Sequence, residues 1–127
     1  MNANIQTSIP VLLVSDAASA KLFYCEKLGF KKQWEYKPSA PEVSPAYLGL
    51  ERDGAQIHIS SFCGDGNLSG VVFFFVGNVD ALFREFSVRD VKFELEPFNQ
   101  TWGNREMYLR DPDGNSLRFG QLLEPTA

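Results

Sequence analysis

Apolar and polar positions along the chain follow the same order of periods in its two halves. In the first half the pattern predicts a strand, a helix and three further strands, over residues 5–14, 17–28, 30–36, 46–50 and 55–62. In the second half it predicts the same elements over residues 71–76, 79–86, 91–95, 104–109 and 115–122. Asp16 and Asn78 are expected to cap the two helices. The helix-forming and strand-forming segments therefore alternate in one fixed order that occurs twice.

The spacing of the turns supports an internal repeat. Asp53-Gly54 and Asp113-Gly114 are favoured hairpin turns and lie about 60 residues apart, as the two helix caps do. The sequence therefore predicts an α+β fold of two βαβββ modules that curve around a shared cavity. We expect a single domain over 1–127, with a first module at about 5–63, a glycine-rich linker at 64–70 and a second module at about 71–122.

Composition narrows the partners that this fold would take. The 127 residues include 12 Lys and Arg against 16 Asp and Glu, so the formal charge is −4 and a nucleic-acid partner is not expected. No apolar run is long enough for a membrane span and no basic leader precedes the first strand, so we expect a cytoplasmic protein without a membrane partner. Cys25 and Cys63 do not have the spacing of a zinc site.

Several motifs resemble those of a known superfamily. The stretches QTWGNRE at 100–106 and LRDPDGN at 109–115 are similar to the carboxyl-terminal motif of the glyoxalase/bleomycin-resistance/dioxygenase superfamily, whose fold is called vicinal oxygen chelate. IPVL at 9–12, Phe23-Tyr24 and LGF at 28–30 resemble its first half. The resemblance implies a homodimer whose subunits exchange amino-terminal strands around Pro10 and build two ligand clefts at their interface.

The superfamily contains both metalloenzymes and metal-free binding proteins, so the metal positions matter. Mapped by motif, the four ligand positions of the metalloenzymes correspond to Ile9, His58, Val71 and Arg118. Only His58 could ligate a metal, whereas a catalytic zinc normally has three protein ligands. We therefore expect neither a metal nor another cofactor.

Polar and aromatic side chains are expected to line the cavity in place of a metal. Strand alternation puts His58, Glu106 and Arg118 on the concave face, because Ile57, Ile59, Met107 and Leu109 suit the helix-covered face. By the resemblance, Trp34 and Trp102 match aromatic residues that stack on a planar ligand in the drug-binding members. The predicted ligand-binding residues are Trp34, His58, Phe73, Trp102, Glu106, Tyr108 and Arg118, with none assigned to catalysis.

These residues favour reversible capture of a planar or aromatic small molecule, as in the bleomycin-resistance proteins, and leave alternatives open. Glu106 would attract a cationic group, whereas Arg118 would favour an anionic or neutral metabolite. Arg118 and Glu106 could instead form a structural salt bridge beside His58. A glyoxalase-like lyase or isomerase, or a dioxygenase-related enzyme, would use His58 as general base with Glu106. A regulatory or immunity module would bind a protein surface through an apolar patch outside the cleft.

Overall fold

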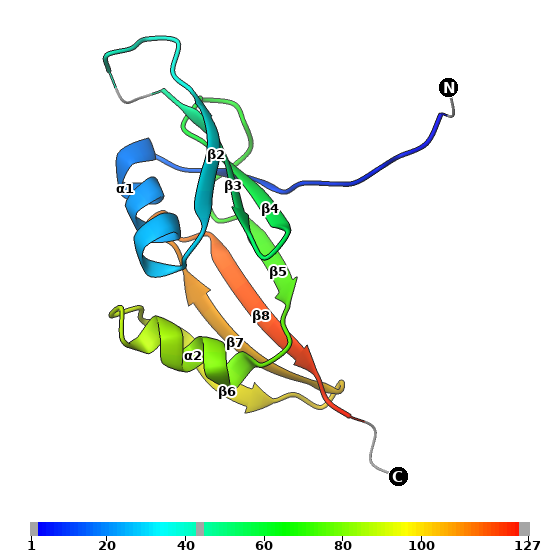
Figure 1. Ribbon diagram of the computed structural model, residues 1–127. Coiled ribbons are helices and arrows are strands. Elements are labelled where there is room, and N and C mark those ends of the chain that lie inside the picture. Colours follow the sequence, from blue (N-terminus) through cyan, green and yellow to red (C-terminus); the bar gives the residue numbers. More distant parts are fainter. Residues whose placement is uncertain (1–2, 43–44, 125–127) are drawn as a thin grey trace.

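The computed structural model describes residues 3–42 and 45–124, and these form two four-stranded sheets, one above the other in Figure 1. The first half contains β1 (Val11–Leu13), α1 (Ala17–Lys21), η1 (Leu22–Lys27), β2 (Lys31–Tyr36), β3 (Tyr47–Arg52) and β4 (Ala55–Ser60). The second half contains β5 (Val71–Phe75), α2 (Val79–Ser87), β6 (Phe93–Asn99), β7 (Asn104–Arg110) and β8 (Ser116–Leu122).

Both sheets have the same topology, which confirms the predicted α+β fold of two βαβββ modules. The strand orders are β1-β4-β3-β2 and β5-β8-β7-β6, with the first strand of each module parallel to its last. Val11 pairs with His58 in the first sheet, and Phe73 pairs with Arg118 in the second. The repeat in the sequence is therefore a repeat of sheet register as well as of element order.

The helices begin where the sequence predicts, but the first one changes its form. Asp16 accepts a hydrogen bond from the Ala18 N–H, and Asn78 accepts one from the Ala81 N–H. The predicted helix over 17–28 is α-helical only to Lys21 and continues as a π-helix. Leu22, the first residue of the π-helix, is 63% exposed, whereas Tyr24 is fully buried.

Two strand predictions need correction. The first strand is predicted over 5–14, but only Val11–Leu13 pairs with β4, and Ile5 is 93% exposed. Apolar composition alone could not reveal that no strand partner continues alongside residues 3–9. The sixth predicted strand, over 91–95, ends at residue 95, whereas β6 runs on through Pro97 to Asn99. A proline is accommodated there because β6 is an edge strand and its pairing with β7 is irregular between Leu95 and Phe98.

Each sheet buries one face in a core that the two modules share. The alternation predicted for the strands is confirmed at Ile57, Ile59, Met107, Leu109 and Leu117, whose side chains are all fully buried. They belong to one cluster that also contains residues of both helical segments. Neither helical segment within 3–42 and 45–124 has the length and hydropathy that a membrane-spanning helix requires.

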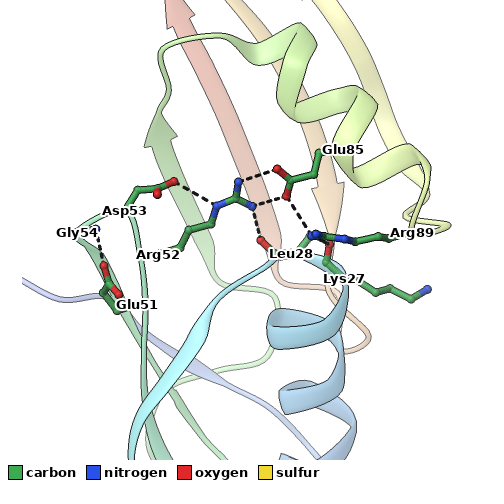
Figure 2. Close-up of polar contacts among 8 residues, drawn as sticks. All are labelled: Lys27, Leu28, Glu51, Arg52, Asp53, Gly54, Glu85 and Arg89. Carbon is green, nitrogen blue, oxygen red and sulfur yellow. Dashed lines mark hydrogen bonds and ion pairs between the residues drawn. The ribbon is translucent and has the colours of Figure 1, made fainter.

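An ion pair connects the two modules on the helix side (Figure 2). The Arg52 guanidinium, at the end of β3, donates to both carboxylate oxygens of Glu85 on α2, at 2.7 and 2.9 Å. It also donates to the Leu28 carbonyl oxygen at 2.6 Å, and Arg89 donates to Glu85 at 3.0 Å. The hydrogen bond from Arg52 holds the pKa of Glu85 below its usual value, although partial burial opposes that shift. Arg52 thus binds the first module to the helix of the second.

A second set of hydrogen bonds joins the modules through the β7–β8 turn. The Tyr24 hydroxyl donates to Asp111 at 2.7 Å, and the Asn115 amide donates to the Leu13 carbonyl oxygen at 3.0 Å. Asp111 and Asn115 are 5% and 0% exposed, so these bonds are shielded from water. The position of one sheet relative to the other is therefore fixed by buried polar contacts as well as by the apolar core.

We predict that Arg52→Ala lowers the free energy of unfolding by about 1–3 kcal/mol, because it removes charge-assisted hydrogen bonds at a half-buried junction. Arg110→Ala is the matched control. Arg110 pairs with Glu94, and both side chains are about half exposed, at 48% and 47%, so its loss should cost about 0–1 kcal/mol. Urea denaturation of the two variants makes the comparison. Equal losses would show that the junction pair contributes no more than a surface pair.

Candidate functional site

Three aromatic rings form a cluster on the open face of the first sheet, the face that the helices do not cover. Trp34 and Tyr47 are stacked, with ring centroids 5.6 Å apart and an interplanar angle of 4°. The His58 ring meets both edge-on, at 5.0 and 5.2 Å. The Tyr47 hydroxyl lies 2.9 Å from His58 Nδ1, within hydrogen-bond distance. We call Trp34, Tyr47 and His58 the first-sheet cluster.

A glycine makes room for this arrangement. Trp34 on β2 is opposite Gly49 on β3, and Gly49 in turn is opposite His58 on β4. A Cβ atom at Gly49 would come within 2.6 Å of the indole nitrogen, so the indole lies directly on the backbone there. The absence of a side chain at Gly49 therefore sets the depth of Trp34 on the sheet.

The first-sheet cluster borders an open hollow of about 550 Å³. Its lining includes Trp34, Tyr36 and Tyr47 from the strands, and Phe62 and Asp65 from the segment after β4. Burial lowers the pKa of His58, which favours a neutral imidazole at neutral pH. The hollow therefore has aromatic walls, and His58 is connected to it through its contacts with Trp34 and Tyr47.

Glu106 organises a second cluster, on the open face of the second sheet. One carboxylate oxygen accepts the Tyr108 hydroxyl at 2.6 Å. The other accepts the Trp102 indole N–H and the Asn104 amide, both at 3.0 Å. Glu106 is only 2% exposed, whereas Trp102 is 62% exposed. The buried carboxylate therefore holds an exposed indole in a fixed orientation.

The charge of Glu106 is stabilised despite its burial. Burial by itself would raise its pKa, but the hydrogen bonds from Tyr108, Trp102 and Asn104, together with the nearby charge of Arg118, keep the pKa below its usual value. The hydrogen bond between Tyr108 and Glu106 raises the pKa of Tyr108, and burial of Tyr108 raises it further. Glu106 is therefore ionised and Tyr108 is a neutral donor at neutral pH.

Arg118 and Phe73 complete the second-sheet cluster, which we define as Phe73, Trp102, Asn104, Glu106, Tyr108 and Arg118. The Arg118 guanidinium lies over the Tyr108 ring, 4.9 Å from its centroid. Phe73 on β5 is beside Arg118 and lies over Gly120, where a Cβ would collide with its ring. An apolar and a cationic side chain are thus neighbours on this face.

The predicted site residues therefore lie in two groups on two sheets. Trp34 and His58 are in the first, and Phe73, Trp102, Glu106, Tyr108 and Arg118 are in the second. No hydrogen bond, ion pair or aromatic contact joins the two groups within residues 3–42 and 45–124. The predicted salt bridge between Arg118 and Glu106 is not formed there either, since Tyr108 and Trp102 bind the carboxylate instead.

Two members of these clusters are absent from the sequence-based predictions. Tyr47 alternates with buried Leu48 on β3, and this alternation was the available signal for its place on the open face. Asn104 is two residues before Glu106 on β7, so the same alternation places both on one face. The contacts of Tyr47 with His58 and of Asn104 with Glu106 could not be inferred from the alternation alone, because alternation gives the face on which a side chain lies and not its orientation.

The residues present do not fit a metal ion. The strand register puts Val11 rather than Ile9 beside His58, and Phe73 rather than Val71 beside Arg118. None of these four apolar side chains has a ligand atom, and Arg118 is a cation. The described part of the chain also contains no group of three His, Cys, Asp or Glu residues arranged to hold a metal.

Comparison with known proteins identifies the family. The sequence profile of a family described as "Glyoxalase superfamily protein" matches residues 2–125. The chain belongs to the glyoxalase superfamily. A search of curated protein sequences found no match.

Several solved structures of other proteins share the fold. TnmS3, an antibiotic binding protein from Streptomyces sp. CB03234, aligns with a TM-score of 0.76 and 24% identity over 96% of this chain and 99% of its own. TioX from Micromonospora sp. ML1 aligns with a TM-score of 0.73 and 17% identity, over 96% and 100%. A lactoylglutathione lyase from Agrobacterium tumefaciens aligns with a TM-score of 0.71 and 19% identity, over 93% and 95%. At these identities the likeness shows the vicinal oxygen chelate fold alone.

We predict that the emission of Trp102 changes when Glu106 is protonated. Because the pKa of Glu106 is lowered on folding, its hydrogen bonds stabilise the cluster above the ordinary glutamate pKa and are lost as the pH falls through the lowered value. In a Trp34→Phe background Trp102 is the only tryptophan. Its fluorescence should show a transition centred below about pH 4.3.

The control is Glu106→Gln in the same background. It keeps the size of the side chain and removes the titration, so the transition should disappear. A transition in the parent protein that is centred above the ordinary glutamate pKa, or that survives the substitution, would contradict the assignment.

Proposed function

We propose that this protein binds a planar aromatic small molecule reversibly and without covalent change, and so sequesters it. The observation that supports the proposal most is the pair of exposed tryptophans, Trp34 and Trp102, at 46% and 62%. Each is held in place on an open sheet face, one over Gly49 and the other by Glu106. Ring systems that are already ordered lose little conformational entropy when a flat ligand stacks on them.

The surroundings of both tryptophans suit such a ligand. Small-molecule sites combine aromatic walls with a few polar groups that fix the orientation of the ligand. Here the walls are Trp34, Tyr47, Phe73 and Trp102, and the polar groups are His58 and Arg118. The description of TnmS3 as an antibiotic binding protein supports the same class of function, because its fold is shared along nearly the whole chain.

The proposal includes a homodimer in which the first-sheet cluster of one subunit faces the second-sheet cluster of the other. Within one chain each cluster covers only one side of a flat ligand. Phe73 and Phe75 on the edge strand β5 are 39% and 68% exposed, which is costly for a free monomer. In Figure 1 the amino-terminal segment extends away from the body of the molecule, which it joins at Pro10, whose carbonyl oxygen accepts a hydrogen bond from the His58 N–H. Exchange of this segment around Pro10 could join two subunits.

A cytoplasmic location is part of the same proposal. Cys25 and Cys63 are both free thiols, and unpaired cysteines are usual in a reducing compartment.

An enzymatic function is the alternative, with His58 as the general base. Its support is the lowered pKa of His58, which leaves the imidazole neutral and able to accept a proton. The shared fold of the lactoylglutathione lyase is compatible with it. The two functions differ in outcome: a binding protein returns its ligand unchanged, whereas an enzyme yields product with a pH–rate profile that His58→Ala abolishes.

We predict that binding of a planar aromatic compound quenches the tryptophan fluorescence and raises the melting temperature. A panel of quinones, phenazines and naphthalene derivatives is suitable, and a compound at 100 times its Kd should add about 2.7 kcal/mol of stability. Trp102→Ala should weaken binding about 3- to 10-fold through the loss of one stacking contact. Val88→Ala, at a position 82% exposed just after α2, is the control and should change nothing. If no planar compound produces a shift, the proposed function is wrong.

The shared cleft predicts complementation between two defective variants. Trp34→Ala and Trp102→Ala damage different sheets, so a heterodimer of the two contains one cleft with both tryptophans intact. After denaturation and refolding as an equal mixture, about a quarter of the clefts should recover full affinity, as expected for random pairing in a two-fold dimer. Titration calorimetry counts these sites. Failure to recover any of them would place each ligand within a single subunit.

A further inference from the structure

The hydrogen-bonding capacity of Glu106 is used within its own chain. Its two carboxylate oxygens accept three hydrogen bonds, from Tyr108, Trp102 and Asn104, and only 2% of the residue is exposed. A cationic group on a ligand could reach this carboxylate only by displacing those donors. Glu106 therefore acts as a positioning residue for Trp102 and Tyr108, which differs from the attraction for cations expected from the sequence.

Arg118 has the opposite character. Its side chain is exposed on the open face, and its guanidinium makes no hydrogen bond or ion pair with any residue within 3–42 and 45–124. The other arginines that border the strands or the module junction, Arg52, Arg89, Arg105 and Arg110, are all in ion pairs. The contact with the Tyr108 ring holds the Arg118 guanidinium on this face while leaving its N–H groups available.

The remaining polar groups near the two clusters do not add an exposed negative charge beside Arg118. His58 is uncharged at neutral pH, and its Nδ1 is taken by the Tyr47 hydroxyl. Asp65 is the one acidic residue among those that line the hollow beside Trp34, and it accepts a hydrogen bond from the Ser60 hydroxyl at 2.7 Å. Asp65 belongs to the first-sheet side, so the second-sheet cluster offers a ligand an exposed cation and no exposed acid.

From this geometry we infer that the ligand is a planar aromatic anion whose carboxylate binds the Arg118 guanidinium while its ring stacks on Trp102. The inference rests on the proposed function and adds the charge of the ligand and the residue that selects it. The planar guanidinium group matches the two oxygens of a carboxylate and can form paired N–H···O bonds with it. A cationic drug would face Arg118, and the second-sheet cluster has no exposed acid to compensate that charge.

Three naphthalene probes of the same shape test the inference by titration calorimetry: 2-naphthoate, 2-naphthamide and (2-naphthyl)methylammonium. They carry an anionic, a neutral and a cationic group on one ring system. We expect 2-naphthoate to bind wild-type protein about 10-fold more tightly than 2-naphthamide, and the ammonium probe to bind more weakly than either. The preference should diminish as salt is raised, because the contact is exposed.

Arg118→Gln and Arg84→Gln form the matched pair of variants. Both remove one positive charge from an exposed arginine, but Arg84 is on α2, away from the open faces. Arg118→Gln should weaken naphthoate binding about 10-fold and leave naphthamide within about 2-fold, whereas Arg84→Gln should change neither. Unchanged melting temperatures show that both variants fold.

The outcomes separate the inference from the proposed function. If naphthamide or the ammonium probe binds wild-type protein as tightly as naphthoate, the inference is wrong and the planar-ligand function stands. If both variants weaken naphthoate equally, the effect is that of net charge and Arg118 does not select the ligand. If none of the three probes binds, the planar-ligand function fails and the inference fails with it.

Discussion

Each sheet of this protein is covered by helices on only one face, and the rest of the structure follows from that constraint. Side chains alternate along a strand, so once one set is buried the other set must line the open face. Burial of Ile57 and Ile59 places His58 outside the core, and burial of Met107 and Leu109 does the same for Tyr108. The candidate site is therefore a geometric consequence of how the core is built.

The two open faces fix their exposed tryptophans by different physical means. Trp34 is held by shape, since the lack of a side chain at Gly49 lets the indole lie on the backbone and stack on Tyr47. Trp102 is held by charge, through an ionised Glu106 whose burial is compensated by three donors. Both indole rings are therefore ordered in the absence of a ligand. The free-energy cost of burying the Glu106 carboxylate is offset by hydrogen bonds from residues of the second-sheet cluster.

The sequence predicts the parts of this arrangement that depend on local rules. Helix caps at Asp16 and Asn78, the turns at Asp53-Gly54 and Asp113-Gly114, and the alternation of the strands are all encoded by a few neighbouring residues. The length of β1 is not, because it depends on where β4 offers a partner. The switch from α-helix to π-helix at Leu22 was not predicted from the local pattern either.

Contacts between side chains at the site were harder to predict, because they also depend on residues that are distant in the sequence. Strand alternation brings Glu106 and Arg118 to one face and suggests a salt bridge, but it cannot tell that Tyr108 is placed between a carboxylate and a guanidinium and interacts with both. The Tyr108 hydroxyl donates a hydrogen bond to Glu106 in place of Arg118, so the positive charge of Arg118 is not cancelled by a direct ion pair.

The internal repeat relates the two polar side chains that stand where the metalloenzymes of the superfamily have metal ligands. His58 and Arg118 occupy equivalent places in the two modules, each beside an apolar residue of the first strand, Val11 or Phe73. A metal would orient a ligand through coordination, whereas here orientation depends on what these two side chains can donate. One is a neutral imidazole and the other a fixed cation, so the equivalent positions differ in charge. In the proposed dimer, a flat ligand between the first sheet of one subunit and the second sheet of the other would therefore meet two chemically distinct ends, and it would have one preferred direction of binding even though the fold around it is nearly symmetric.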